Sequence, residues 1–512
     1  MTRPVRATAV TLAQGLAVAL AACAVGPNYR PAPTPAAAAH PFASAAPSFA
    51  APEPPPADWW RLYNDPTLDG FVHEALTENT DLQVAAANLL KARAVLSQAT
   101  AGLYPTTTLA ANDLWGFSSF DQLFGFISGA KPPPSWFATG SATINYQVDL
   151  FGRIRRGIEA ARGDAQAAAD AEDVVRITVA AETARAYADA CALGDEADTA
   201  RRSAETDRQV LDLTRHMRDL GARSDFDVAS AAAAYDAERA NIPTLEGQRR
   251  AQLYELAVLT GRPPAEISQA AAACNTPPRI ERPLPVGDGA ALLKRRPDVR
   301  EADRRLAADV ARVGVATADF YPTVSLMGQP ATAGATAQQF FSPTFLTYQI
   351  GPMITWSFPN VLVAKAEVAQ ARAQARASLA AFDGVVLTAL KETEQALTAY
   401  GAELRRHAAL GAARDDAQRA FDLAQLQLKR GAISFPDLLV TEHNLEVAQA
   451  SLAASDQALV DDQVAVFQSL GGGWQDAPPV TPPKLPGHAR ATRVDPPADD
   501  AAQGLDRATP SH

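Results

Sequence analysis

One residue near the start of the chain is placed for covalent attachment of a lipid. Cys23 follows the run Leu-Ala-Ala, and small residues before a cysteine are what a lipoprotein signal peptidase requires. Two arginines lie within the first six residues, and residues 7–20 form an apolar stretch behind them. We therefore expect residues 1–22 to be a lipoprotein signal peptide and Cys23 to carry the lipid. The alternative is an ordinary secretory peptide that is cut nearby, with Cys23 incidental.

Three acidic residues could act together if several copies of the chain surrounded an axis. A ring of carboxylates repeated by symmetry binds cations and opposes the passage of anions. Asp437, with Glu442 about one turn further, is the candidate for such a ring, and Asp227 is its counterpart in the first half. Asp437 also lies three residues after Ser434, where an acidic side chain caps a helix without any other function. Both interpretations stay open.

The remaining residues do not indicate an enzyme. The sequence contains no G-x-x-x-x-G-K-[ST], no nucleophile elbow and no H-E-x-x-H, and its seven histidines are scattered. Cys191 and Cys274 form no C-x-x-C pair, so neither a metal site nor a disulfide framework is expected, and Cys191 is interpreted as a small helix residue. A formal charge of −11 disfavours nucleic acid as a partner. We expect no catalytic residue, no metal and no cofactor besides the lipid.

Two very long helices must position the acidic residues. Residues 361–430 contain no proline and are rich in Ala, Leu, Gln, Glu, Lys and Arg, which favour helix. At 1.5 Å per residue this segment would be roughly 105 Å long. Gly431, Ser434 and Asp437 then provide a helix end and the capping pair of a return helix over residues 435–470.

The return helix carries a repeat of seven residues that is typical of a supercoiled helix contact. Its members are Leu438, Leu445, Leu452, Leu459 and Val466.

The first half of the chain repeats this design. Gly221, Ser224 and Asp227 have the same spacing as the three residues of the later turn, and they follow a long helix predicted over residues 153–220 and precede a return helix over 225–259. The sequence therefore predicts an internal twofold repeat.

Each long helix is preceded by segments with a period of two. Even positions between residues 138 and 150 are apolar and odd positions are polar, and residues 346–358 show a similar alternation. With a partner strand each, these segments predict β-hairpins over 106–150 and 323–358. A soluble sandwich would also alternate in this way. Two facts favour a membrane barrel instead: the mature sequence has no apolar run long enough for a membrane helix, and aromatic residues flank the strands.

Four strands cannot close a barrel, so several copies would have to contribute. The expected fold is mainly α-helical with a membrane β-barrel, continued by a coiled-coil tube.

The expected organisation follows from these elements and from composition. The ranges are 1–22 for the signal peptide, 23–57 for a Pro/Ala-rich tether without a core of its own, 58–261 for the first repeat, 262–297 for a crossover between the halves, 298–473 for the second repeat and 474–512 for a disordered tail.

Three motifs in this order resemble one known family. They are Leu-Ala-Ala-Cys with Val-Gly-Pro-Asn-Tyr at residues 20–29, Asp-Leu-Phe-Gly-Arg-Ile-Arg at 149–155, and Leu-Leu-Lys-Arg-Arg-Pro-Asp-Val-Arg at 292–300. The chain resembles the NodT branch of the TolC-like outer-membrane efflux lipoproteins over nearly all of residues 23–474. One departure is that the acid often found nine residues after the tip glycine is here Val440, whereas the aspartate that some members carry six residues after it corresponds to Asp437.

The resemblance implies both a fold and a role. The fold would be a homotrimer with a twelve-stranded barrel in the outer membrane, four strands from each chain, and a periplasmic α-helical tunnel. The role would be a passive exit duct for drugs or small solutes, joined to an inner-membrane transporter through a periplasmic adaptor. The expected adaptor contacts at the hairpin tips are Gly221, Arg223, Gly431 and Ile433. Two alternatives are a duct for protein secretion and a lipid-anchored coiled-coil scaffold without a pore.

Overall fold

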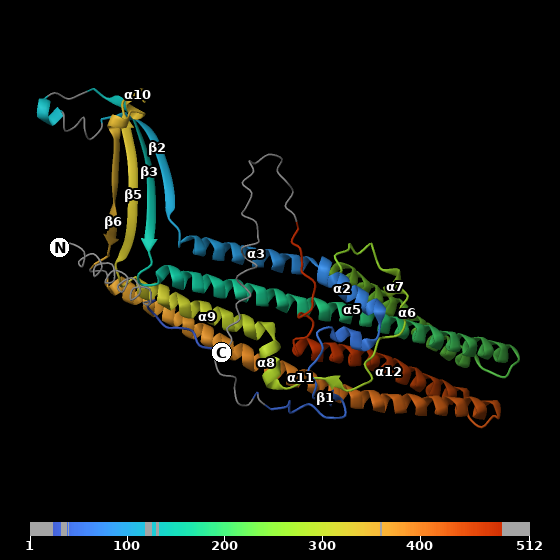
Figure 1. Ribbon diagram of the computed structural model, residues 1–512. Helices are drawn as coiled ribbons and strands as arrows, with labels where there is room; N and C mark the ends of the chain where they lie inside the picture. Colours follow the sequence, from blue (N-terminus) through green and yellow to red (C-terminus); the bar gives the residue numbers. More distant parts are fainter. Residues whose placement is uncertain are drawn as a thin grey trace.

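The computed structural model describes residues 24–31, 38, 40–117, 125–129, 133–358 and 361–483. The signal peptide expected over residues 1–22, the lipidated Cys23 and residues 484–512 of the expected tail lie outside the described residues. Figure 1 shows an elongated molecule with a four-stranded sheet at one end and a bundle of long helices extending from the lower edge of that sheet.

The sheet consists of two antiparallel hairpins that lie side by side. Its strands are β2 (Thr106–Gly116), β3 (Ser135–Val148), β5 (Thr323–Gly334) and β6 (Leu346–Thr355), in the spatial order β2-β3-β5-β6. The two hairpins, from different halves of the sequence, join where β3 pairs with β5. In the described part of the chain β2 and β6 have no further partner, so they form the two edges of the sheet.

The pairing register gives the sheet one predominantly apolar face. Directly paired residues point to the same side of an antiparallel sheet. Leu109 pairs with Ala142, Ile144 with Gly328, and Gly328 with Ile350, so even positions of β3, β5 and β6 share a face. Side chains on that face are Leu109, Trp115, Trp136, Ile144, Leu326, Tyr348, Ile350 and Ile354. The opposite face carries mostly Thr, Ser, Asn and Gln.

Two long helices extend away from the sheet. α5 (Arg153–Asp219) follows β3 and has 67 residues, and α11 (Val361–Lys429) follows β6 and has 69. At 1.5 Å per residue each is about 100 Å long. None of the described helices is both long and apolar enough to cross a bilayer.

Shorter helices pack along each of these two rods. α5 contacts α3 (Thr80–Ala101) near the sheet and α6 (Asp225–Leu259) further out. α11 contacts α9 (Pro297–Ala318) and α12 (Phe435–Ser469) in the same order. α6 runs through Pro243 without interruption.

The crossover between the halves is partly ordered into short elements. α7 (Gln269–Ala272) contacts α5, and α8 (Gly289–Arg295) contacts α11. The segment therefore runs from one long helix to the other.

The largest hydrophobic core lies where this crossover meets the middle of the bundle. It includes α2 (Pro66–Glu78) and the short 3₁₀ helix η2 (Trp59–Tyr63), and the ring of Trp59 stacks on that of Phe467 with centroids 4.9 Å apart.

The segment predicted to be a tether without a core contributes to this core. Phe42 and Phe49 are buried, and the Phe49 ring meets that of Tyr400 edge to face at 5.7 Å. β1 (Ala50–Ala51) pairs in parallel with β4 (Leu284–Pro285) of the crossover. The prediction is therefore wrong for residues 42–51, because the Pro/Ala composition concealed two aromatic anchors. At the other end, Val480 packs against the same core, so the prediction of a disordered tail is wrong for residues 474–480.

A disulfide joins Cys191 of α5 to Cys274 of the crossover, so the expectation of no disulfide is wrong. The two cysteines are 83 residues apart in the sequence. Their pairing could not be predicted from a local motif, because it depends on the crossover folding back onto α5. Gly194 permits the close approach, since a Cβ there would lie 2.8 Å from the carbonyl oxygen of Cys274.

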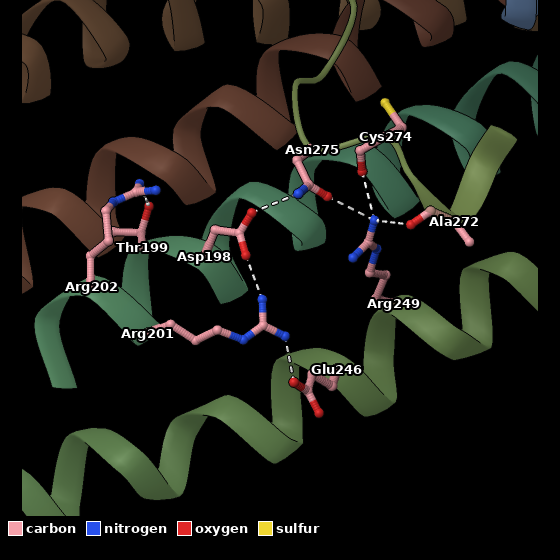
Figure 2. A network of polar contacts seen from close by, with 9 residues as sticks. All are labelled: Asp198, Thr199, Arg201, Arg202, Glu246, Arg249, Ala272, Cys274 and Asn275. Carbon is pink, nitrogen blue, oxygen red and sulfur yellow. Dashed lines mark hydrogen bonds and ion pairs between the residues drawn. The ribbon is translucent and has the colours of Figure 1, made fainter. Parts of the chain in front are cut away.

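A polar network fixes the same part of the crossover. Figure 2 shows Arg249 of α6 donating hydrogen bonds to the carbonyl oxygens of Ala272 and Cys274, both at 2.7 Å, and to the side chain of Asn275 at 2.8 Å. The Asn275 amide in turn donates to Asp198 of α5 at 2.6 Å. The disulfide and these bonds together anchor the crossover to α5 and α6.

Candidate functional site

The two hairpin tips at the far end of the bundle have the same backbone geometry. Gly221 and Gly431 adopt φ angles of +72° and +73°, which residues with a side chain rarely adopt. After each glycine an amide reaches back to the last helical turn: Ala222 donates to Met217 and Ala432 to Gln427, both at 2.9 Å. This is the Schellman motif, which ends each helix and satisfies carbonyl groups of its last turn.

The acidic residues Asp437 and Asp227 cap the helices that follow the tips. The Ser434 amide donates to Asp437 at 2.9 Å, and Asp437 is solvent-exposed. Ser224 and Asp227 form the same reciprocal pair at 3.0 Å. Hydrogen bonds from Ser434 lower the pKa of Asp437, so its contribution to stability is present above the ordinary aspartate pKa and is lost as pH falls through the lowered value.

The capping role gives a testable expectation. Replacing Asp437 by alanine removes the acceptor for the Ser434 amide and is expected to lower the thermal midpoint of the helices. Asparagine keeps an acceptor oxygen and should retain most of the stability. Circular dichroism of both variants, with Asp227→Ala and Asp227→Asn as the matched pair at the other tip, measures the difference. An unchanged midpoint in Asp437→Ala contradicts the capping role.

The other predicted tip residues connect the two hairpins. The Arg223 guanidinium, from the first tip, lies 5.0 Å from the ring centroid of Phe435 at the start of α12. Ile433 packs against the apolar cluster that contains Phe435 and Leu438. The two tips therefore pack against each other within one chain, while their glycines remain exposed.

Glu442, which the sequence places near Asp437, has a different environment. Its residue is only 3% exposed, and neither carboxylate oxygen has a hydrogen-bond partner in the described part of the chain. Burial and the neighbouring Asp207 raise the pKa of Glu442 to about 7. Glu442 therefore does not share the solvent-exposed position of Asp437.

Two further acidic residues that the sequence analysis missed lie beside Glu442. Asp207 of α5 is 3% exposed, and burial raises its pKa. Glu446 follows Glu442 by one helical turn, and burial together with Asp207 raises its pKa to about 8. The spacing of four between two glutamates on the apolar side of α12 was a readable signal. The contribution of Asp207 could not be predicted from the sequence, because it depends on how α5 aligns with α12.

At the other end of the helices, the motif at residues 149–155 forms the junction with the sheet. Asp149 accepts hydrogen bonds from the amides of Ile154 and Arg155, both at 3.0 Å, and so caps the start of α5. Gly152 turns the chain with a φ of +80°. The ring of Phe151 stacks on that of Tyr321, with centroids 4.5 Å apart. The motif thus converts a strand into a long helix in a few residues.

The motif at residues 292–300 closes the end of α12. Arg295 donates to the carbonyl oxygen of Leu470 at 2.8 Å, and Arg296 to that of Ser469 at 2.9 Å. Cationic side chains at the last carbonyls of a helix satisfy acceptors that have no helical partner. Arg296 also pairs with Glu392 of α11 at 2.8 Å. The described residues contain no cluster of His, Cys, Asp and Glu that could hold a metal ion.

Comparisons with known proteins agree with this architecture. The family model described as "Outer membrane efflux protein" matches residues 71–262 and 290–472. Nodulation protein T of Rhizobium leguminosarum bv. trifolii is 27% identical over 461 residues, which cover 89% of this chain and 95% of that protein. The pyoverdine export outer membrane protein OpmQ of Pseudomonas aeruginosa is 28% identical over 432 residues, covering 81% of this chain and 87% of that one.

A solved structure extends the likeness to the fold. The outer-membrane channel OprN is similar with a TM-score of 0.80 at 31% identity, over 88% of this chain and 100% of that one. The resemblance seen in the three motifs is therefore confirmed. Because the family model covers well over half of the sequence, this chain belongs to the outer membrane efflux protein family.

Proposed function

We propose that this chain is the outer-membrane exit channel of a tripartite efflux system, and that it passively conducts drugs or other small solutes. One observation carries the proposal most directly. A sheet with one apolar and one polar face continues into helices about 100 Å long, which suits a duct that leaves the membrane and crosses an aqueous space. A periplasmic adaptor and an inner-membrane pump would deliver the solutes.

The proposed channel requires more than one copy of the chain. The edges of β2 and β6 would leave backbone groups unpaired in lipid, which only a closed barrel avoids. Three copies, each giving four strands, would form a twelve-stranded barrel, with β6 of one copy beside β2 of the next. The matching order of helices along α5 and α11 supports an internal twofold repeat, in which each half provides one strand pair and one helical pair.

Efflux from intact cells tests the role. Deleting the gene from its host is expected to raise the accumulation of a fluorescent efflux substrate such as ethidium, and the wild-type gene should restore export. Accumulation that is the same with and without the gene, for every compound in a panel of cationic, neutral and anionic probes, contradicts export of small solutes.

The position of the first described residues supports lipid attachment at Cys23. The amide of Val25 donates to the carbonyl oxygen of Phe151 at 3.1 Å. A Cβ at Gly152 would lie 2.7 Å from that of Ala24, so Ala24 packs where β3 gives way to α5. A lipid on the preceding residue would then start at the rim of the sheet, where a bilayer surface is expected.

Cys23→Ser is expected to abolish incorporation of a radioactive fatty acid. Some membrane association should remain, because the sheet provides a second attachment. Labelling of immunoprecipitated protein checks the expectation, with wild type as the positive control. Equal labelling of the two proteins contradicts lipidation at this residue.

We further propose that the periplasmic end closes at the hairpin tips. Asp437 and Asp227 are the gate candidates at the tips, whereas Glu442 is buried in the bundle and is not proposed for the gate. The adaptor would contact Gly221, Arg223, Gly431 and Ile433. The contact between Arg223 and Phe435 supports this idea, because a partner that moves one tip must also disturb the other. If Asp437 contributes to a ring, Asp437→Asn should weaken block of single-channel current by a trivalent cation without a matching loss of stability.

A further inference from the structure

Three carboxyl groups meet inside the helical bundle where α5 passes α12. We call Asp207, Glu442 and Glu446 the carboxyl cluster. Asp207 and Glu442 are each 3% exposed, and the side chain of Glu446 is 17% exposed. Both oxygens of Glu442, one of Asp207 and one of Glu446 have no hydrogen-bond partner in the described part of the chain. A buried carboxyl group with unpaired oxygens is expected to be neutral, because its charged form would have a high free energy there.

The charged groups around the carboxyl cluster do not neutralise its negative charge. Glu238 of α6 adds a further negative charge near Asp207 and Glu446. His443 of α12 lies 3.7 Å from Glu446, but its side chain is 73% exposed. Arg202 of α5 and Arg414 of α11 line the adjacent pocket, and each contacts a neighbour on its own helix. Among the described residues, no lysine or arginine forms an ion pair with the cluster.

The packing around the cluster leaves room for change. A pocket of about 410 Å³ that opens to solvent lies between α5, α11 and α12, and Glu442 and Glu446 are among its lining residues. Phe421 and Leu445 also line this pocket, and both belong to the apolar cluster that contains Phe435. If the carboxyls became charged, their side chains could rotate into this space and be hydrated there.

We propose that the carboxyl cluster is a proton-controlled latch, which holds α5 against α12 while it is protonated and loosens this contact when it loses protons. The only ligand that this latch requires is the proton. Like charges from two helices, buried without a counter-ion, repel each other and force either separation or hydration. Its effect on transport rests on the proposed function as a channel, whereas the latch itself is a property of the helices.

The direction of the pH dependence follows from proton linkage. Glutamate in the separated helices has an ordinary pKa near 4.5, whereas the packed state raises that of Glu442 to about 7 and that of Glu446 to about 8. The packed state therefore binds more protons, and it loses stability as pH rises from about 4.5 to about 8. Across that window, each pH unit through which one carboxyl titrates shifts the packed-to-loosened ratio by about tenfold.

Hydrogen exchange of the full-length assembly in detergent tests the latch without requiring channel activity. After correction for intrinsic rates, amides near residues 203–211 and 438–449 should exchange at least about tenfold faster at about pH 8.5 than at about pH 5.5. The double variant Glu442→Gln/Glu446→Gln, which imitates the protonated state, should lose this difference. Glu205→Gln removes an exposed acid two residues from Asp207 and is the matched control that should behave as wild type.

The outcomes separate the latch from the channel. A wild-type pH profile in the double variant overturns the latch, whatever the protein conducts. If the double variant fails to fold, Glu446→Gln alone at the more accessible position should reduce the pH difference, and an unchanged difference overturns the latch equally. Loss of pH-dependent exchange in the variant, together with a wild-type protein that never conducts, supports the latch but contradicts the channel.

Discussion

Replacing Ile350 by arginine is expected to prevent most of the protein from assembling in the outer membrane. Ile350 lies at the middle of β6 on the apolar face of the sheet and is 85% exposed in the single chain. An arginine on the lipid face of a membrane barrel costs about 2–4 kcal/mol at mid-membrane, and a symmetric assembly would bear this cost in every copy. The amount of heat-modifiable oligomer in isolated outer membranes measures the effect.

Gln349 provides a matched control at the same depth. It is adjacent to Ile350 but points to the polar face, where its amide contacts that of Gln329 across the strand pair. Gln349→Arg introduces the same side chain with the same charge, yet it should assemble normally and change the ion selectivity of the pore. If both arginine variants assemble to the same extent, the apolar face does not contact lipid.

Removing the disulfide is expected to destabilise the helical body by about 2–5 kcal/mol, because it closes a long loop in the unfolded chain. Cys191 is fully buried, so alanine at both positions is the mildest replacement. The double variant Cys191→Ala/Cys274→Ala should unfold at lower denaturant concentration than wild type, as followed by circular dichroism. The network around Arg249 remains in this variant, so the crossover should keep its native position.

Reductant supplies the control for this comparison. It should shift the unfolding midpoint of wild type toward that of the double variant, and it should leave the double variant unchanged. A wild-type midpoint that does not respond to reductant under denaturing conditions contradicts a stabilising disulfide. A periplasmic position of the crossover agrees with this bond, since disulfides persist in that oxidising compartment.

The features that could be predicted from the sequence are those determined by neighbours in the chain. The alternation before Leu150 and the capping spacing of Ser434 and Asp437 depend on local geometry alone, and the structure places a strand and a capping box at these positions. The three motifs also led to the family that the comparisons confirm. Local periodicity is a strong signal when helices and strands are this long.

The features that were missed depend on contacts between distant segments. Phe49 packs against Tyr400 and Gly401 of α11, which lie far away in the sequence. Cys191 meets Cys274 only after the crossover has folded onto α5. The environment of Glu442 likewise depends on the alignment of α12 with Asp207 of α5, so an apparent partner of Asp437 belongs to a buried cluster instead.

Reconstitution of the purified full-length protein into planar lipid bilayers is the most direct test of a conducting channel. We predict discrete current steps from the oligomer, with larger or more frequent openings at about pH 8.5 than at about pH 5.5. Liposome flotation in parallel establishes that the protein has inserted. Inserted oligomer that carries no current at either pH, and none after replacement of Asp437 by alanine, would contradict the channel.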